Sequence, residues 1–432
     1  MSLAEELAEL PDGVAAATQV IAGLDDCLRT GFARLTETHR DALSLLVGTL
    51  SESPLGEALA EAVDACGRSE FVVRHFVLLA TSRAALQGAQ YDALRGQLLS
   101  VMNHSPQESD PVVFEPAGEA SAVLSSVQQW LMELAIGGFQ HLEESQVAPF
   151  VATLEQLQSH AKLTGLASLL TGFVNELLRC MPAEKQTSLP VFRWADLWAA
   201  AFVRTQQVAQ QPVGKDTSGV LTPLGADVRS HENFALATVF GVLETDSDSR
   251  CVKIPLSSYK VDVVGGAEIW DLFGDVSDPL LKALETGKCL KIDNAELRSD
   301  GDLVLRSKPK LGRAAKPFSL TDQIGPLPAV APLMRHPVQL AELVVLDGDH
   351  GFEIATERLS DPAEITASVM KSARQVIGLL RFDREQWRLQ PLCVDSGKAV
   401  ITAGESLLKV RTKLKSKTLA ILKERSGRLL RG

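Results

Sequence analysis

The spacing of apolar residues changes once along this 432-residue chain, near residue 232, and that change limits the folds it can adopt. Before residue 212, apolar side chains recur every three or four positions, as Val73, Phe76 and Ala80 do, which is the spacing of one face of an α-helix. After residue 233, they alternate with polar side chains in runs such as RCVKIPL, which is the period of a β-strand. The sequence therefore predicts an all-helical first half followed by β-rich parts.

The chain divides into four segments at these changes. Residues 1–212 hold helical stretches separated by prolines and short polar loops, without a repeat of fixed period. Residues 206–232 mix Gln, Pro, Gly, Asp and Ser without any period, which is typical of a linker. We therefore predict a multidomain α and β protein: an N-terminal helical array over 1–212, a linker over 213–232, a small β-barrel over 233–316, and an α+β unit with a basic C-terminal helix over 317–432.

Residues 233–316 contain five strand-like runs around one helical stretch. NFALATVFGVLET, RCVKIPL and SYKVDVVG precede the helical GAEIWDLFGDVSDPLLKALETG, and KCLKIDNAEL and DLVLRSK follow it. The alternation changes phase near Ser257, which indicates a bend of the kind that lets strands curl into a small barrel. Three strands, a helix and two strands is the order of an OB-fold.

The local sequence pattern of this segment provides further evidence for its fold. An aromatic helix at residues 269–272 leads to a turn at Gly287, a strand over 289–292 followed by Asn-Ala, and a last strand over 301–306 that ends in basic and polar residues. In these features, residues 234–314 resemble the single-stranded DNA-binding OB domains of the replication protein A type. The resemblance implies a ligand lying across the second and third strands of the barrel.

A basic ribbon, RSKPKLGRAAK, follows the last of these strands. Sequence-tolerant binding of single strands needs cations for the phosphates and exposed aromatic rings for the bases, but Tyr259, Trp270 and Phe273 are expected to point inward. The ribbon is either a clamp on a phosphate backbone or a solvated linker that protects a barrel edge. The candidate nucleic-acid-binding residues are Lys253, Lys260, Lys291, Arg298, Arg306, Lys308, Lys310 and Arg313.

The net charge of −11 is unevenly distributed. Residues 1–212 hold 25 acids and 12 bases, whereas residues 405–432 hold nine bases and two acids. Such asymmetry indicates two kinds of partner, and we expect the acidic helical part to recruit a protein. The basic C-terminal helix is predicted to lie on nucleic acid or on an acidic protein surface. A membrane surface is the weaker alternative, because the helix has no aromatic anchors.

No apolar run reaches the length of about 20 residues that a membrane-spanning helix needs, and the acidic N-terminus does not resemble a signal peptide. The six cysteines are scattered without a CxxC spacing, which favours a reducing compartment. We therefore expect a cytoplasmic protein without a membrane partner.

The last segment is expected to hold a hairpin-like ELVVLDGDHGFEIA, a helix over PAEITASVMKSARQVIGLLR, and a second hairpin in QWRLQPLCVDSGKAVITA. Its acidic cluster of Asp347, Asp349, His350 and Glu353 has side chains that could hold a divalent ion. However, Asp-Gly and His-Gly between apolar runs are also typical of a tight turn, and we favour the turn.

Searches for catalytic and nucleotide-binding motifs find none: GxxxxGK[ST], GxGxxG, HExxH and GxSxG are all absent. Trp194 and Trp198 lie four apart on one predicted helical face, which indicates core packing. The sequence thus predicts no catalytic residues, no metal site and no cofactor.

The sequence favours a non-catalytic nucleic-acid-binding protein, with single strands preferred, that also recruits a protein partner. The alternative is an adaptor or scaffold subunit of a multi-protein assembly that uses the OB-like segment for protein contacts. Parts of the N-terminal half resemble bacterial proteins encoded beside MoxR-type AAA+ ATPases. That resemblance implies such an ATPase as the partner in the alternative.

Overall fold

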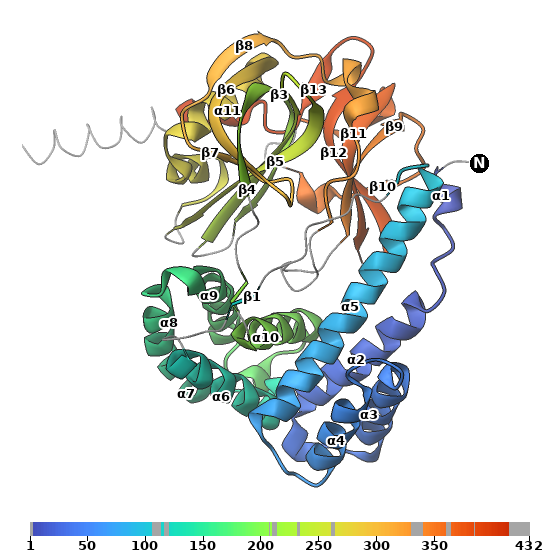
Figure 1. Ribbon diagram of the computed structural model, residues 1–432, viewed down its shortest axis with the longest axis vertical. Helices are drawn as coiled ribbons and strands as arrows, with labels where there is room; N and C mark the ends of the chain where they lie inside the picture. Colours follow the sequence, from blue (N-terminus) through green and yellow to red (C-terminus); the bar gives the residue numbers. More distant parts are fainter. Residues whose placement is uncertain are drawn as a thin grey trace, which may run out of the picture.

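The computed structural model describes residues 3–105, 114–115, 121–206, 208–209, 214–230, 234–260, 264–329, 340–359, 364–383 and 385–413. Most of the helices up to Gln206 form one end of the molecule and two β-sheets form the other, with α1 and the end of α5 beside the sheets (Figure 1). The predicted fold class, helical first and then β-rich with a central barrel-like sheet, is confirmed.

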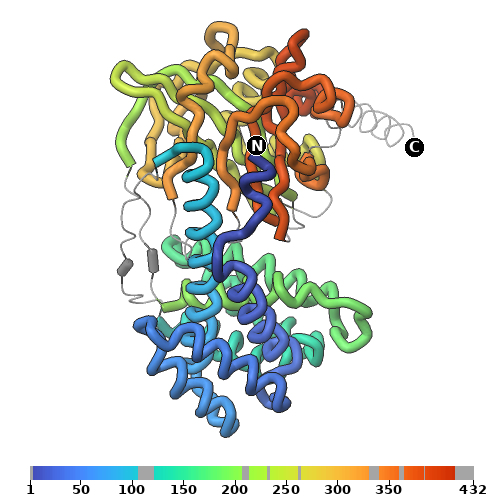
Figure 2. Tube along the Cα trace, turned by 90° about the vertical axis from the view of Figure 1, so that its right-hand side faces the viewer, coloured from blue at the N-terminus to red at the C-terminus, as the bar shows by residue number. Residues whose placement is uncertain are grey.

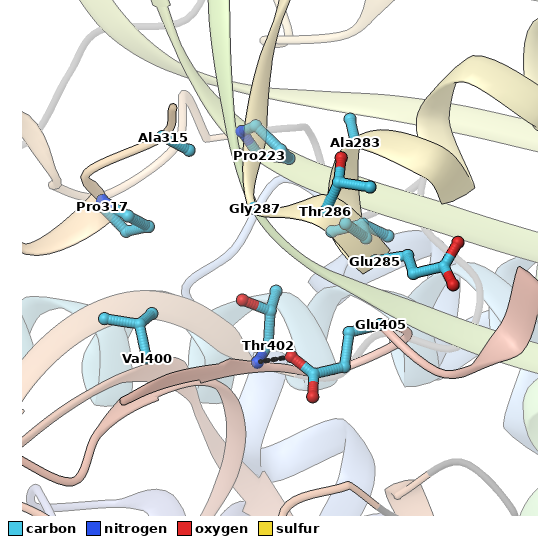
Figure 3. A pocket seen from close by; sticks show the side chains of 11 residues that line it. Pro223, Ala283, Glu285, Thr286, Gly287, Ala315, Pro317, Val400, Thr402 and Glu405 are labelled. Carbon is cyan, nitrogen blue, oxygen red and sulfur yellow. Dashed lines mark hydrogen bonds between the residues drawn. The ribbon is translucent and has the colours of Figure 1, made fainter. Parts of the chain in front are cut away.

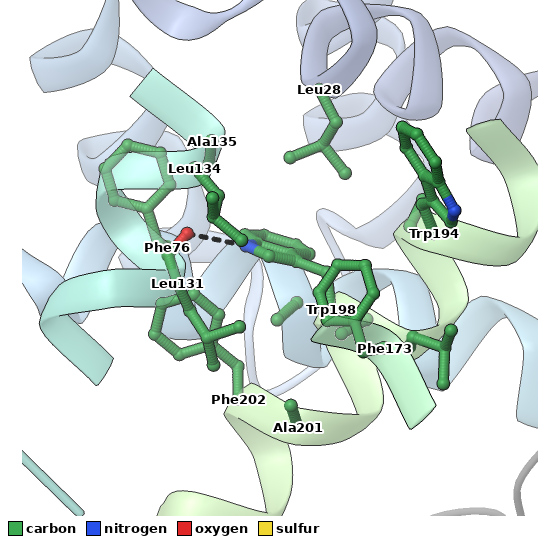
Figure 4. Packing of buried hydrophobic residues seen from close by; sticks show 14 of the residues in the cluster. Leu28, Phe76, Leu131, Leu134, Ala135, Phe173, Trp194, Trp198, Ala201 and Phe202 are labelled. Carbon is green, nitrogen blue, oxygen red and sulfur yellow. Dashed lines mark hydrogen bonds between the residues drawn. The ribbon is translucent and has the colours of Figure 1, made fainter. Parts of the chain in front are cut away.

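The helical part is built around a large apolar core. Trp194 and Trp198 are fully buried in it, as predicted, and Figure 4 shows Trp198 packed among Leu131, Phe202 and their neighbours. The indole Nε1 of Trp198 donates to the carbonyl oxygen of Leu131 at 2.9 Å, so this polar atom is satisfied inside the core. The helices are α1 Leu3–Glu6, α2 Val14–Thr30, α3 Glu37–Leu50, α4 Gly56–Gly67, α5 Val73–Val101, α6 Ser121–Gly137, α7 Glu144–Val147, α8 Val151–Gln158, α9 Thr164–Arg179 and α10 Val191–Gln206.

This part contains a repeat that the sequence pattern did not indicate. GFARLTETH at 31–39 and GFQHLEESQ at 138–146 both follow a long helix, begin with a glycine at positive φ, and bury their phenylalanine. Both then start a new helix through a capping box, Thr36 with His39 and Glu143 with Gln146. The same glycine turn and helix cap therefore occur twice in the helical part.

The two glycine turns of this repeat pack against each other. A Cβ atom on Gly138 would lie 2.4 Å from the carbonyl oxygen of Thr30, and one on Gly31 would lie 2.7 Å from the carbonyl oxygen of Gly137. Their positive φ angles and this close approach both require glycine. The equivalent rings Phe32 and Phe139 each make an edge contact, with an aromatic ring of α5 and of α10 respectively.

Helix α5 connects the helical part to the C-terminal sheet. Its 29 residues span about 44 Å, and its last turns pack with Val344 and Val376 of that sheet. The guanidinium Nε of Arg95 donates to Glu342 at 2.7 Å in a buried contact. The residues around Leu7 join the same cluster, which places the first described residues beside the sheet (Figure 2).

The central sheet is antiparallel and nearly closed. Its strand order is β5-β4-β3-β6-β7, and β8 also pairs with β6. A parallel bridge between Lys253 and Asp302 links β5 to β7, which brings the two ends of the sheet together. The elements are β3 Gly214–Ser230, β4 Phe234–Glu244, β5 Ser249–Tyr259, η7 Gly266–Val276, α11 Ser277–Thr286, β6 Lys288–Arg298, β7 Leu303–Leu305 and β8 Lys310–Ala314. This arrangement is compatible with an OB-like fold.

The predicted linker over 213–232 is wrong, because Gly214–Ser230 forms β3, which pairs with both β4 and β6. Its Gly and Pro residues have places within the ladder. The pairing with β4 shifts between Pro223 and Gly225, and a bulge of this kind accommodates residues that weaken regular strands. Leu221 and Leu224 are fully buried.

The bend predicted near Ser257 is not observed, because β5 runs without interruption from Ser249 to Tyr259. The predicted third strand over 258–265 is therefore wrong at its start, and residues 261–263 lie outside the described ones. The order of three strands, a helical connection and further strands is still observed, because β3 replaces the missing strand.

The C-terminal sheet has the order β10-β12-β11-β9, with β13 added to β12. The second predicted hairpin is confirmed by the pairing of β12 with β13. The first is wrong, because β9 pairs with β11 and β10 pairs with β12. Most of the predicted helix over 362–381 is also wrong: only α12, Ala367–Lys371, is helical, and β11 follows it. The strands are β9 Ala341–Asp347, β10 Glu353–Ile354, β11 Gln375–Asp383, β12 Gln386–Asp395 and β13 Val400–Thr402.

Candidate functional site

The eight cations selected from the sequence all lie on the barrel. Lys253 belongs to β5 and Lys260 follows it, whereas Lys291 and Arg298 belong to β6. Arg306 and Lys308 connect β7 to β8, and β8 itself carries Lys310 and Arg313, with all five of its residues exposed. The ribbon after β7 is thus partly an edge strand paired with β6.

Six of these eight side chains form ion pairs with carboxylates of the barrel. Lys291 and Lys310 share Asp293, at 3.1 and 3.0 Å. Arg306 lies 2.5 Å from both Asp216 and Glu296. The remaining pairs are Lys253 with Asp302 at 3.1 Å, Arg298 with Glu296 at 3.1 Å, and Arg313 with Glu244 at 2.9 Å.

These pairs keep the carboxylates ionised. Hydrogen bonds from Lys310 and Lys291 lower the pKa of Asp293, and hydrogen bonds from Arg306 and Arg298 lower the pKa of Glu296. Ionised carboxylates among the cations reduce the positive potential that a phosphate backbone would meet. Lys308 is exposed and makes no ion pair with any described residue.

The outer face of β4 and β5 packs against the C-terminal sheet. Phe240, Val242 and Cys251 form one buried cluster with residues of β9 and β11, including Leu343 and Ile377. Burial raises the pKa of the Cys251 thiol to about 11. Part of the surface across the second and third strands, where the sequence resemblance implies a ligand, is therefore covered by the chain itself.

The aromatic side chains of the barrel differ in part from the prediction. Trp270 and Phe273 are buried as expected. Tyr259 does not point inward: it is 48% exposed, lies edge-on to Phe234, and its hydroxyl is 2.9 Å from the hydroxyl of Ser168 in α9. The reason is that β5 continues through the predicted bend, so that the alternation of its faces is not reset.

The beginning of the basic C-terminal helix rests on the barrel. Residues 407–413 are helical, and Leu407 belongs to the barrel core. Arg411 is buried and pairs with Asp278, and its Nη1 lies 3.5 Å from Asp271. Lys409 lies 3.6 Å from Glu285. Residues 414–432, which hold the other basic side chains of this predicted helix, lie outside the described ones.

A cavity of about 260 Å³ lies between the barrel and the C-terminal sheet. The end of α11 and the turn at Gly287 form one wall, and residues of β13 with Glu405 form the opposite wall (Figure 3). The backbone N–H of Thr402 donates to the carboxylate of Glu405 at 3.1 Å. Burial raises the pKa of Glu405, and the nearby Glu364 raises it further.

The acidic cluster after β9 is a connecting loop. Asp347 ends β9, Glu353 begins β10, and Nδ1 of His350 accepts the N–H of Phe352 at 3.0 Å. Burial lowers the pKa of His350. No group of three His, Cys, Asp or Glu side chains within the described ranges is arranged to hold a metal ion. The predicted tight hairpin turn is wrong in detail, since the strands on either side pair with different neighbours.

One polar constellation in the helical part was not found from the sequence. The hydroxyl of Thr36 lies 2.9 Å from Nδ1 of His39, whose Nε2 lies 3.0 Å from Asp26. The order of hydroxyl, imidazole and carboxylate is that of a nucleophilic site. However, Nδ1 also accepts the backbone N–H of Thr36 at 3.1 Å. In the second of the two similar turns, Glu143 and Gln146 form the same kind of helix cap. We therefore interpret the constellation as a helix cap.

No protein-family model, no curated protein and no solved structure matches this chain. Among the residues that the structure describes, no helix has the length and apolar character to cross a membrane.

Proposed function

We propose that this chain is a non-catalytic scaffold that binds another protein. The observation that carries the proposal is the use of the barrel's β4–β5 face, where Phe240, Val242 and Cys251 pack against the C-terminal sheet. The part of the barrel where the sequence resemblance implies a nucleic-acid ligand is thus partly covered by the chain itself, which favours a protein over nucleic acid as partner. An OB-like barrel, related in its strand order to the replication protein A type, is suited to this use because OB-folds serve several classes of ligand.

Two further observations support a scaffold. Helix α5 is fixed at the C-terminal sheet by a buried ion pair and apolar contacts, so the helical part and the sheets are held in a defined relation. The helical part carries the acidic excess of the chain, which favours a basic protein surface as partner. The resemblance of its sequence to proteins encoded beside MoxR-type AAA+ ATPases makes such an ATPase the first partner to test.

The test is reconstitution from purified components. The full chain is captured with its partners after nuclease treatment, each candidate is purified, and the complex is measured by calorimetry at low and physiological salt. We expect a stoichiometric complex that resists nuclease and that tolerates the replacement of Arg306, Lys308, Lys310 and Arg313 by Glu. The absence of any complex that re-forms from purified proteins would overturn the proposal.

Nucleic-acid binding is a second candidate, and one observation favours it. Lys291 and Lys310 share a single carboxylate, and Lys308 has no ion-pair partner among the described residues, so this part of β6 and β8 keeps a positive excess. Binding of a phosphate backbone there would weaken steeply with salt, because each neutralised phosphate releases counterions.

Fluorescence anisotropy with labelled single- and double-stranded oligonucleotides tests this second candidate. Salt-sensitive binding that is tighter for single strands and lost in the four-residue Glu variant would support it. A control variant with the same change of charge, on the exposed helical surface, replaces Arg40, Arg68, Arg74 and Lys185 by Glu. Equal loss in both variants would show non-specific attraction and would contradict a site on the barrel.

A further inference from the structure

The cavity between the barrel and the C-terminal sheet has walls of two kinds. Pro223, Pro317 and Val400 provide apolar surface, and Val400 is 46% exposed. The carboxylates of Glu285 and Glu405 come from opposite walls (Figure 3). A ligand that matches these walls combines an apolar stem with a polar end.

The polar side of the cavity is negative. α11 ends beside the cavity, and the C-terminal end of a helix carries partial negative charge. Glu285 is in the last turn of α11, and Nζ of Lys409, whose side chain is 73% exposed, lies 3.6 Å from its carboxylate. Glu405 accepts one backbone N–H through Oε2, and no ion pair with a described cation within 4 Å is found for it. A cation in the cavity would therefore meet a carboxylate that has no ion pair within 4 Å among the described residues and that only the charge of Lys409, from farther away, offsets in part.

A second negative group disfavours the ionised form of Glu405 at this position. Glu364 lies near it and is fixed by the N–H and hydroxyl of Ser406, at 3.0 and 2.6 Å. Burial and this repulsion both disfavour the ionised form of Glu405. A bound cation offsets both effects, which is how half-buried carboxylates in binding sites select positively charged groups.

We propose that this cavity binds a basic side chain of the partner protein, with a guanidinium group at Glu405 and its alkyl stem between Pro317 and Val400. The inference rests on the proposed protein-binding function. A guanidinium group fits better than an ammonium group, because its planar set of donors reaches a carboxylate and backbone carbonyls together and because it is more weakly hydrated. A volume of about 260 Å³ accommodates one such side chain.

The test uses N-acetyl-arginine amide as the probe and N-acetyl-citrulline amide as its uncharged control, titrated into the full chain by calorimetry or NMR. For a probe of this size we expect a Kd of about 1 mM, with no saturation by the citrulline compound. N-acetyl-lysine amide is expected to bind more weakly than the arginine probe.

Three variants locate the site. Glu405→Gln is expected to weaken the arginine probe about tenfold, and Glu285→Gln by about twofold, since a more exposed charge contributes less. Val400→Lys, at an exposed position where folding is little affected, places a competing cation at the opening and is also expected to weaken binding. Glu57→Gln on the surface of α4 is the matched control and is expected to bind as the wild type does.

The outcomes separate the two proposals. Failure of the arginine probe to saturate at about twenty times the expected Kd, or equal binding of arginine and citrulline probes, would overturn the cavity site. A partner complex that forms equally well with wild type and with Glu405→Gln would also overturn it and would leave the scaffold function standing. Glu405-dependent binding of the probe, with no complex formed by any purified protein, would contradict the scaffold function and would retain the cavity as a guanidinium site.

Discussion

The buried arginines of this protein and the exposed cations of its barrel are both ion-paired, but they have different physical roles. Arg83 is fully buried in the helical part and donates to both oxygens of Asp25, at 2.8 and 3.0 Å. By contrast, Lys310 and its partner Asp293 have 73% and 41% of their side chains exposed. Solvent and salt screen the second kind of pair and hardly affect the first.

The contacts of Arg83 show that its role is to stabilise the fold. Besides Asp25, it binds Asp196 at 3.1 Å and the carbonyl oxygen of Phe192 at 3.2 Å. Its charge and the two carboxylates form a buried network inside the core, and Gln87 also donates to Asp196 at 2.9 Å. Removing Arg83 leaves the carboxylate of Asp25 desolvated without its cation.

The largest effect is expected at Arg83. Arg83→Met keeps most of the side-chain volume but leaves Asp25 buried without its cation and removes one cation from Asp196, which should lower the free energy of unfolding by about 3–5 kcal/mol. Urea unfolding followed by tryptophan fluorescence measures this, because Trp194 and Trp198 lie in the same core. Arg68→Met removes a fully exposed pair with Glu70 and serves as control. Equal effects at the two positions would remove the distinction between buried and exposed pairs.

The next effect is expected at the junction of α5 with the C-terminal sheet. Glu342→Gln removes the carboxylate that accepts from Arg95 at 2.7 Å and from Tyr91 at 3.3 Å. The buried guanidinium is then left without its counter-charge, at a cost of about 2–4 kcal/mol. Because the contact joins two parts of the molecule, we expect thermal unfolding to separate into two transitions, which differential scanning calorimetry resolves. A single transition at the wild-type temperature would contradict this role.

A smaller, pH-dependent effect is expected at Asp227, between the barrel and the C-terminal sheet. Burial acts to raise the pKa of this carboxyl, but attraction from Arg229 and Arg381 and a hydrogen bond from Gln390 outweigh it, so the pKa is lowered. Burial lowers the pKa of Arg381 to about 10, with Arg229 and Arg358 repelling its charge. The carboxylate of Asp227 thus interacts with the guanidinium groups of both Arg229 and Arg381.

A lowered carboxyl pKa stabilises the folded state as long as the group is ionised there, and the stabilisation is full where the group is ionised in the unfolded chain as well. This contribution is complete above the ordinary Asp value near pH 4 and is lost as pH falls through the lower folded value. The difference in unfolding free energy between wild type and Asp227→Asn should therefore be constant from pH 7 to about pH 5 and should shrink below about pH 4. A difference that grows on acidification would contradict the assigned direction.

The sequence predicted the helical part and the alternating strands because those patterns are local. Its errors occur where tertiary contacts determine the secondary structure. β3 contains Gly219, Pro223 and Gly225, whose composition is that of a linker, and it forms a central strand because Leu221 and Leu224 are buried between β4, β6 and the C-terminal sheet. The run QVIGLL in β11 is equally buried on both sides, so it carries no alternation that separates a strand from a helix.

The candidate site was predictable only in part. The basic residues were correctly placed on the barrel, because charge is visible in sequence. Their neutralisation was not predictable, since Asp216 and Glu244 are 90 and 69 residues away from the arginines they bind. The cavity at Glu405 had no local signal at all, because its walls come from four separated stretches of the chain.

The smallest effect on folding is expected at the barrel surface. Lys310→Glu with Arg313→Glu places two new acids near Asp293 and Glu244, but all four groups face solvent, where the interactions are screened. We expect the urea midpoint in physiological salt to stay within experimental error of the wild type, with a small decrease at low salt. A large decrease at both salt concentrations would mean that these pairs hold β8 on β6, and the exposed cations would then belong with Arg83 as structural charges. An unchanged midpoint leaves their side chains available for a partner, which is the property a contact surface requires.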